Sequence, residues 1–363
     1  MEPSLFLDLV EKWFPRLVLS VTREINGEDR EDPLYFPRFL SRRFSLSGQW
    51  DAIHQVSSRV MADVIAMDSS IPLKRREAIS SAKGEIPKLA MEMQLNETQL
   101  TNLLTMQSSS LFTEQQLVTE LFRDLASCIR GQYERLDYLF LKGLSSGVVE
   151  VDNTDNVGIG VRLDYQYPAA NQFSSSLPWT NPLATPFTDL QPLLAKARRD
   201  GNPIRRIMLD RATWQGILDT DQAKQIYAEA LGIVTGAPAS LIMEDRFNQI
   251  VQSNYGFVFE IVERTCVYQI NGEDTAVDPW ESGQVIALNN TNLGALVWSF
   301  LAEAQRPVSG VTYQTVDQFI LASQYHLRRP SYAEVTSSQS RAVPVIAAVN
   351  QIYKLDSTQT ATT

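Results

Sequence analysis

The clearest pattern of apolar and polar positions lies between residues 113 and 146. Thr113 and Gln116 have the spacing of a capping box, which starts a helix. One face of the helix that follows is apolar. Its members are Leu117, Leu121, Leu125, Ile129, Tyr133, Leu136 and Phe140. At ~1.5 Å per residue, about thirty residues predict a rod of roughly 45 Å that ends near Gly147, a spine on which sheets can lie.

Two further segments are typical of extended strands. Residues 60–69 are one, and residues 85–95, which alternate apolar and polar from Leu89, are the other. The polar stretch between them carries Lys74-Arg75-Arg76. This arrangement predicts a protruding hairpin with a basic tip. Because isolated two-stranded hairpins are marginal in water, we expect it to rest on a neighbouring molecule.

The first 45 residues predict an arm. The apolar stretch Leu5–Leu19 is interrupted by Pro15, and Asn26-Gly27 is a turn signal. The next residues are rich in charge and proline and do not resemble a core. We therefore expect residues 1–45 to pack on another surface.

The rest of the chain alternates short helices and strands, which indicates an α+β fold. Strands are expected in residues 147–167, and a compact α+β unit over roughly 190–300. Within that unit the pattern predicts a helix at 188–200, a strand at 204–209, a helix from 213, a long strand run at 257–270 and a strand at 283–288. Residues 311–355 are expected to return to the spine as strands. The polar residues 357–363 predict a disordered tail.

Composition narrows the class of protein without deciding it. A chain of 363 residues predicts two domains or one elongated unit. No apolar run reaches the ~18 residues of a membrane span, and no signal peptide is visible. The net charge of −10 argues against a protein that coats nucleic acid. It suits an abundant protein, or a container whose wall does not adhere to nucleic acid, and equally a generic acidic protein. The two cysteines, Cys128 and Cys266, favour synthesis in a reducing cytoplasm.

Motifs that carry chemistry are missing from the sequence. The two histidines, His54 and His326, have no partnering motif, and no zinc-hydrolase or nucleophile-elbow signature is present. Residues 152–156 begin like a calcium loop, but Val157 stands where the loop needs glycine. We therefore predict no catalytic residue, no metal ligand and no cofactor. Pairs of arginines recur along the chain, and only the Lys74–Arg76 group stands out from ordinary surface ion pairs as a contact with another subunit.

Taken in order, these parts resemble a known family. An arm, a protruding loop, a spine helix, an inserted α+β unit and returning strands are similar to the major capsid proteins of tailed bacteriophages, which have the Hong Kong 97 fold. Several strings resemble the lambda-type (gene E) family in particular, from about residue 40 to 355. They are residues 67–77, 84–88 and 94–97 in the loop region, 202–209 before Trp214, and 268–272, 283–288 and Leu293-Gly294 later in the chain.

The resemblance implies a division of the chain. Its parts are an N-terminal arm (1–45), an extended loop with its base (46–110), a peripheral domain (111–199) containing the spine helix (113–146), an axial domain (200–300), returning strands of the peripheral domain (301–356) and the tail (357–363). The arm and the loop would contact adjacent subunits.

The resemblance also implies function and partners. The chain would form the hexamers and pentamers of an icosahedral head that encloses double-stranded DNA without reading its sequence and without a membrane. A portal protein, a separate scaffolding protein and a decoration protein are the implied partners. Some capsids of this fold join a loop lysine to an asparagine. Lys74, Lys83 and Lys88 lie where such a lysine would, although a basic loop without this chemistry is the simpler interpretation.

Two alternatives stay open at this point. The first is the shell protein of an encapsulin-like compartment, which shares the fold but packages enzymes. The second, from a different class, is an α+β enzyme with its substrate bound among the loops of residues 190–300, although no coherent set of catalytic groups supports it.

Overall fold

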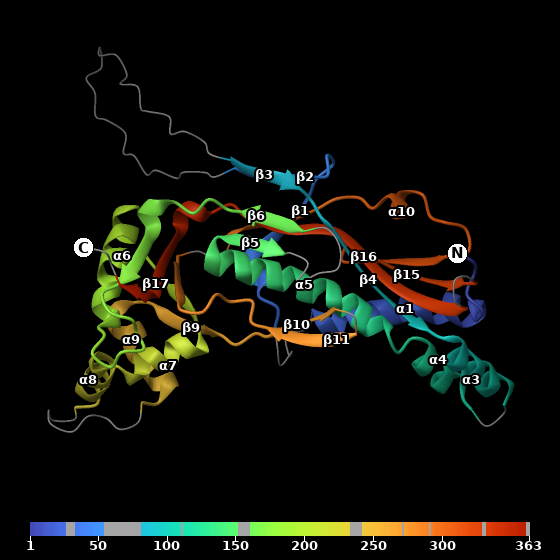
Figure 1. Ribbon diagram of the computed structural model, residues 1–363, viewed down its shortest axis with the longest axis horizontal. Helices are drawn as coiled ribbons and strands as arrows, with labels where there is room; N and C mark the ends of the chain where they lie inside the picture. Colours follow the sequence, from blue (N-terminus) through green and yellow to red (C-terminus); the bar gives the residue numbers. More distant parts are fainter. Residues whose placement is uncertain are drawn as a thin grey trace, which may run out of the picture.

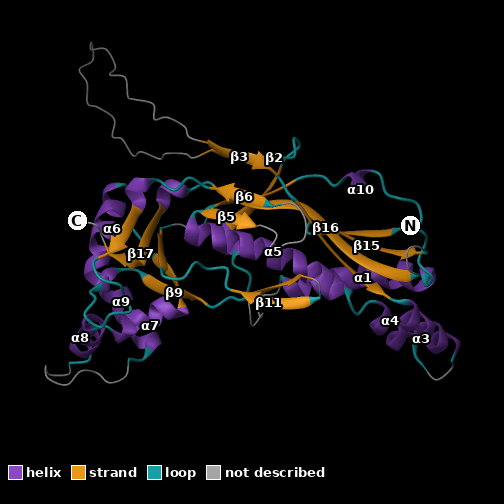
Figure 2. Cartoon of the chain, in the orientation of Figure 1, coloured by secondary structure: helices purple, strands orange, loops and turns teal. Residues whose placement is uncertain are grey.

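The computed structural model describes residues 1–26, 33–53, 81–109, 112–151, 160–232, 242–270, 272–289, 292–328 and 332–360. The molecule is elongated, with a large lobe and a small lobe along its long axis (Figure 1). Each lobe has its own cluster of buried apolar side chains. Helices and strands contribute to both lobes, which confirms the predicted α+β class (Figure 2).

A six-stranded sheet forms the large lobe, in the order β1-β13-β16-β15-β14 with β4 paired to β16. Its strands are β1 (Leu40–Phe44), β4 (Lys88–Leu95), β13 (Gly294–Trp298), β14 (Thr312–Val316), β15 (Ile320–Leu327) and β16 (Ala333–Ile346). The first part of β16 pairs with β15 and β4, and its last part pairs with β13. This one long strand therefore ties the lobe together.

Two helices pack along this sheet and against each other, α1 (Leu7–Ile25) and α5 (Leu125–Ser146). A pair of helices, α3 (Glu97–Ser108) and α4 (Glu114–Leu121), extends beyond the sheet (Figure 1). The short helix α2 (Phe36–Phe39) directly precedes β1, and the short helix α10 (Ala302–Gln305) lies between β13 and β14. The α5 helix ends at Gly147, whose φ of +85° is one that glycine adopts without strain.

The small lobe has a five-stranded sheet in the order β7-β17-β12-β8-β9. Its strands are β7 (Gln172–Ser175), β8 (Arg206–Asp210), β9 (Val258–Val262), β12 (Gln284–Leu288) and β17 (Ile352–Thr360). Its helices are α6 (Pro186–Arg199), α7 (Arg211–Asp219), α8 (Asp221–Ala230) and α9 (Glu244–Tyr255).

This second sheet separates the hydrophobic core of the small lobe from that of the large lobe. Along β12, Val285 and Ala287 belong to the core of the small lobe, whereas Ile286 and Leu288 belong to the core of the large lobe. Successive side chains of a strand point to opposite faces of the sheet. A strand that has a hydrophobic core on each side is therefore apolar at every position.

Three hairpins and two turns of 3-10 helix complete the described part. The hairpins are β2–β3 (Gln49–Ile53 and Ser81–Glu85), β5–β6 (Val148–Val151 and Val161–Asp164) and β10–β11 (Cys266–Ile270 and Glu273–Val277). The 3-10 turns are η1 (Ala169–Asn171) and η2 (Val349–Gln351). The predicted strand 60–69, the basic group Lys74–Arg76, His54 and the turn 152–156 lie outside the described residues.

The prediction of one continuous spine helix is wrong. The capping box at Thr113 and Gln116 is present, but the helix that it starts ends at Leu121, and the chain turns before α5 begins. The turn places Phe122 in the core, where its ring centroid lies 6.1 Å from that of Phe14. The spine is therefore the 22-residue α5 alone, about 33 Å long.

The prediction that residues 1–45 pack away from the chain's own core is also wrong. The α1 helix runs through Pro15 and buries Val10, Phe14 and Val18. A proline inside a helix removes one backbone hydrogen bond, and the burial of this apolar face offsets that loss. Before α1, Glu2 exchanges two backbone hydrogen bonds of 3.0 Å with His326.

Two smaller expectations also differ from the structure. Residues 257–270 form two strands in different sheets, because the chain leaves the small lobe after β9 and enters the β10–β11 hairpin. Ser357 is buried and belongs to β17, so the residues from Ser357 to Thr360 continue a strand of the small lobe. The prediction of disorder rested on the polar side chains of this segment. In the structure Ser357 is satisfied within the fold, because its amide (2.9 Å) and its hydroxyl (2.8 Å) both donate to Gly283 O.

Candidate functional site

The β2–β3 hairpin leaves the body of the large lobe (Figure 1). Its strands pair from Gln49 with Glu85 to Ile53 with Ser81, and β2 also contacts β16. A sheet of two strands is marginally stable in water by itself. The hairpin is therefore a segment that a neighbouring molecule would stabilise.

The hairpin root, defined as Gly48, Trp50, Ile86 and Arg341, fixes where the hairpin leaves the body. The Arg341 guanidinium donates to Ile86 O (3.2 Å) and Gly48 O (3.3 Å), and the Trp50 side chain in β2 is buried. Gly48 has a φ of +69°, and a Cβ there would lie 2.6 Å from the guanidinium. The root was not predicted from the sequence; the available signal was Arg341, which stands between a serine-rich run and the apolar end of β16.

The predicted basic contacts divide between described and undescribed parts of the chain. Lys83 lies in β3 and Lys88 begins β4, and both are exposed. Lys88 is the register partner of Arg341, so it stands next to the hairpin root. Lys74, Arg75 and Arg76 lie outside the described residues. All five stay predictions as contacts between subunits.

An aromatic patch, formed by Phe44, Trp298 and Phe300, lies close to this root. The ring of Phe44 lies 4.7 Å from that of Trp298 and 4.5 Å from that of Phe300, measured between centroids. Phe44 and Phe300 are 40% and 42% exposed, and nearby Leu46 is 80% exposed. Exposed apolar clusters are typical of surfaces that pack on another molecule. The patch was not predicted from the sequence, because its members meet only when β1 pairs with β13.

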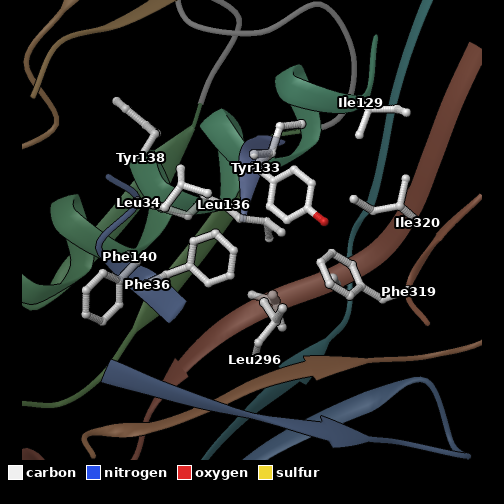
Figure 3. Close-up of a cluster of buried hydrophobic side chains, with 14 of the residues drawn as sticks. Leu34, Phe36, Ile129, Tyr133, Leu136, Tyr138, Phe140, Leu296, Phe319 and Ile320 are labelled. Atoms are coloured by element: carbon white, nitrogen blue, oxygen red, sulfur yellow. The ribbon is translucent and has the colours of Figure 1, made fainter. Parts of the chain in front are cut away.

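The side chains predicted for the spine's apolar face are all buried: Leu117 and Leu121 in α4, and Leu125, Ile129, Tyr133, Leu136 and Phe140 in α5. Figure 3 shows part of this core, with Tyr133 directed toward Phe319. The Tyr133 hydroxyl donates to Asp317 Oδ2 (2.6 Å), which also accepts from Asn26 (2.8 Å) and Arg42 (2.9 Å). Asp317 thus links α1, β1 and α5 at the β14–β15 turn.

A polar seam holds α5 to β16. Gln132 donates to Ser338 and accepts from Ser340, and the Ser338 hydroxyl donates to Cys128 O (2.6 Å). These groups are buried, so each lost hydrogen bond would leave an unsatisfied polar atom. The seam therefore fixes the register of the spine on the sheet more strictly than apolar packing alone would.

Several of the repeated arginines form ion pairs within the chain. Arg42 contacts Asp317, Arg206 contacts Glu260, and Arg328 contacts Glu2. These three arginines therefore have partners within the chain without a second subunit.

No cluster of three or more histidine, cysteine or acidic side chains that could hold a metal ion occurs among the described residues. Within the same residues, no helix is both long enough and apolar enough to cross a membrane.

Comparison with known proteins identifies the fold. A putative capsid protein of a prophage from Escherichia coli CFT073 superposes with a TM-score of 0.56 over 93% of this chain and 98% of its own, at 10% identity. A phage-related protein from Bordetella bronchiseptica RB50 gives 0.51 over 93% and 96%, at 12% identity. No family model and no curated protein matches the sequence. The chain has the Hong Kong 97-type capsid fold, and the lambda-type subfamily stays a prediction.

Proposed function

We propose that the chain is a major capsid protein of a tailed bacteriophage, which assembles into the hexamers and pentamers of an icosahedral head around double-stranded DNA. The observation that carries this proposal is the fold, which spans nearly the whole of this chain and of a putative prophage capsid protein. A role in a shell also accounts for the projecting hairpin and the exposed aromatic patch, because each would be covered by a neighbouring copy.

The proposed role is structural, and the protein is a component of the virion made in the cytoplasm of a bacterial host. In this proposal the large lobe is the peripheral domain and the small lobe is the axial domain. The portal, scaffolding and decoration proteins implied by the sequence resemblance are its proposed partners. The net charge of −10 supports a wall that encloses DNA without adhering to it.

The test is to overexpress the chain and image the product by negative-stain electron microscopy, with light scattering to measure its mass. We expect shells, tubes or ring-shaped capsomers. A monomer that persists at high protein concentration would contradict the proposal. Particles isolated from the natural host that contain a cargo enzyme and no nucleic acid would instead favour the encapsulin-like alternative.

The proposed contact through Lys74, Arg75 and Arg76 is tested by replacing all three with alanine. We expect a folded subunit that assembles more weakly, since carboxylates on the next subunit would lose the ammonium and guanidinium groups that bind them. A matched control replaces Arg198, Arg199 and Arg246, three exposed arginines of the small lobe. Normal particles from the first variant would exclude the basic contact while leaving the shell function intact.

A further inference from the structure

The β4 strand is an edge of the large sheet. It pairs with β16 along its whole length, from Lys88 opposite Arg341 to Leu95 opposite Glu334. No strand among the described residues pairs with its other side. In Figure 1 it runs from the hairpin to the α3–α4 pair. The free side of an edge strand presents backbone N–H and C=O groups, which a further strand can bind.

The side chains of β4 alternate between two surroundings. One row points toward the spine helix, since a Cβ on Gly131 of α5 would lie 2.4 Å from Met91 Sδ. The other row is exposed to solvent and consists of Lys88, Ala90, Glu92 and Gln94. A strand bound at the free side would therefore meet an apolar row on one face and a polar row on the other.

The exposed row carries two opposite charges, Lys88 and Glu92, placed evenly on either side of Ala90. Neither has an ion-pair partner among the described residues, and the Tyr325 hydroxyl donates to Glu92 Oε2 over 3.5 Å. Arg341 is the register partner of Lys88, so it adds positive charge at the same end of the row. Such a row is complementary to a copy of itself that is turned through 180° about Ala90.

The charges select one register of antiparallel pairing between two β4 strands. Centred on Ala90, the pairing places each Lys88 opposite Glu92 of the second copy, so two ion pairs form together. Centred on Lys88 or on Glu92, it would place like charges opposite each other, which is unfavourable. The favoured register also pairs apolar side chains on the face toward α5, and it ends at Pro87, which has no backbone N–H.

The small lobe shows how this chain closes the edge of a sheet. The Asn248 side chain donates to Phe259 O (2.7 Å) and accepts from Phe259 N (2.8 Å) in the edge strand β9. A further strand can bind there only by displacing Asn248. No side-chain amide of the described residues covers the backbone of β4 in this way. The free side of β4 is therefore available to a partner strand.

We propose that β4 binds β4 of a second copy of this chain, antiparallel and across a two-fold axis at Ala90, with two ion pairs between Lys88 and Glu92. The contact makes one continuous sheet of the large sheets of two copies, and it gives the predicted contact of Lys88 a partner. In the proposed shell it would join two subunits related by a two-fold axis. The pairing itself does not depend on the shell function.

A disulfide at the axis tests the pairing. Residues opposite each other in antiparallel strands have Cα atoms about 4.5–5.5 Å apart, a separation that a disulfide spans. Ala90→Cys in the full chain should therefore give a covalent dimer under copper–phenanthroline oxidation, which non-reducing gel electrophoresis measures. The natural cysteines, Cys128 and Cys266, are buried. Gln94→Cys is the matched control, because it lies in the same exposed row but roughly 27 Å from its counterpart in this register.

Charge reversal tests the register. Lys88→Glu added to the Ala90→Cys chain makes both cross-strand contacts repulsive, and so does Glu92→Lys. We expect either change to slow covalent dimer formation by about tenfold. Co-expression of the two variants should restore about half of the original rate, because opposite charges then face each other only between unlike chains. Arg198→Glu, which reverses an exposed charge of the small lobe, should leave the rate unchanged.

The outcomes separate this proposal from the shell function. No covalent dimer from Ala90→Cys, or equal cross-linking at residues 90 and 94, would overturn the pairing. Charge-reversed chains that cross-link as fast as the original would also overturn it, provided that circular dichroism shows them to be folded. Normal shells without the cross-link would reject the pairing and leave the proposed function, whereas a cross-linked dimer that never forms particles would do the reverse.

Discussion

Gly294 illustrates how closely strands approach one another in the large sheet. It lies in β13, where its register partners are Leu40 of β1 and Ile346 of β16. A Cβ at this position would lie 2.0 Å from the carbonyl oxygen of Val345. Since that oxygen belongs to the backbone, a larger residue can be accommodated only if two strands move apart.

We therefore expect Gly294→Ala to lower the free energy of unfolding by about 1–3 kcal/mol. Urea denaturation followed by circular dichroism measures the change. Gly256→Asn is the control, because Gly256 has a φ of +81° with open space around it, and asparagine tolerates that conformation. Equal stability of the Gly294→Ala variant and the unaltered chain would show that the strands are less closely packed than described.

At this scale the sequence predicts apolar packing well and polar contacts poorly. The buried side chains of α5 follow from a helical period that is visible in the sequence. Arg264 and Glu134 are 130 positions apart, and no local pattern connects them. This ion pair and the hairpin root each depend on the tertiary contacts of a single arginine, Arg264 or Arg341, which periodicity does not encode.

The N-terminal helix is the element that differs most from expectation. Pro15 suggested an interruption, yet Val10, Phe14 and Val18 face the core at helical spacing on both sides of it. In the spine the opposite occurs. The apolar face in the sequence predicts one continuous helix, whereas the chain turns at Phe122 between α4 and α5. In both cases the packing of one aromatic side chain, Phe14 or Phe122, outweighs the local backbone preference.

Phe14→Ala tests whether α1 belongs to the folded body. We expect a loss of about 3–5 kcal/mol in the free energy of unfolding, because a large side chain is removed from a closed core. Leu19→Ala on the same helix is the control, since Leu19 is 49% exposed and its truncation should change stability by less than about 0.5 kcal/mol. If the first 45 residues were an unattached arm, both variants would unfold like the original chain.

At the scale of the molecule, the α+β class could be predicted from the sequence, whereas the strands that make up each lobe could not. The small-lobe sheet takes β7 from before residue 200 and β17 from the end of the chain, so it is not a simple insertion of consecutive residues. Strand pairings between distant segments decide this, and hydrophobic alternation gives a strand's faces but not its neighbours.

The whole-molecule prediction concerns the hairpin. Ile53 and Ser81 are register partners, so a two-residue Asn-Gly turn can replace residues 54–80 without disturbing β2 or β3. Under the proposed shell function, we expect unchanged thermal stability and no shells, because the shortened chain lacks the proposed contact of the hairpin with the neighbouring subunit. Size-exclusion chromatography and electron microscopy measure this outcome. Normal shells from the shortened chain would exclude the hairpin as an assembly element.

The position of β16 and β17 in the two sheets has a consequence for synthesis on the ribosome. Residues 333–360 supply the strand that ties the large lobe together and an interior strand of the small lobe. Neither sheet can close until residues 333–360 have emerged, although α1 and α5 are made much earlier. A nascent chain therefore stays unfinished as a building block until these two strands are made, and chains terminated before residue 333 lack the strands that both lobes need.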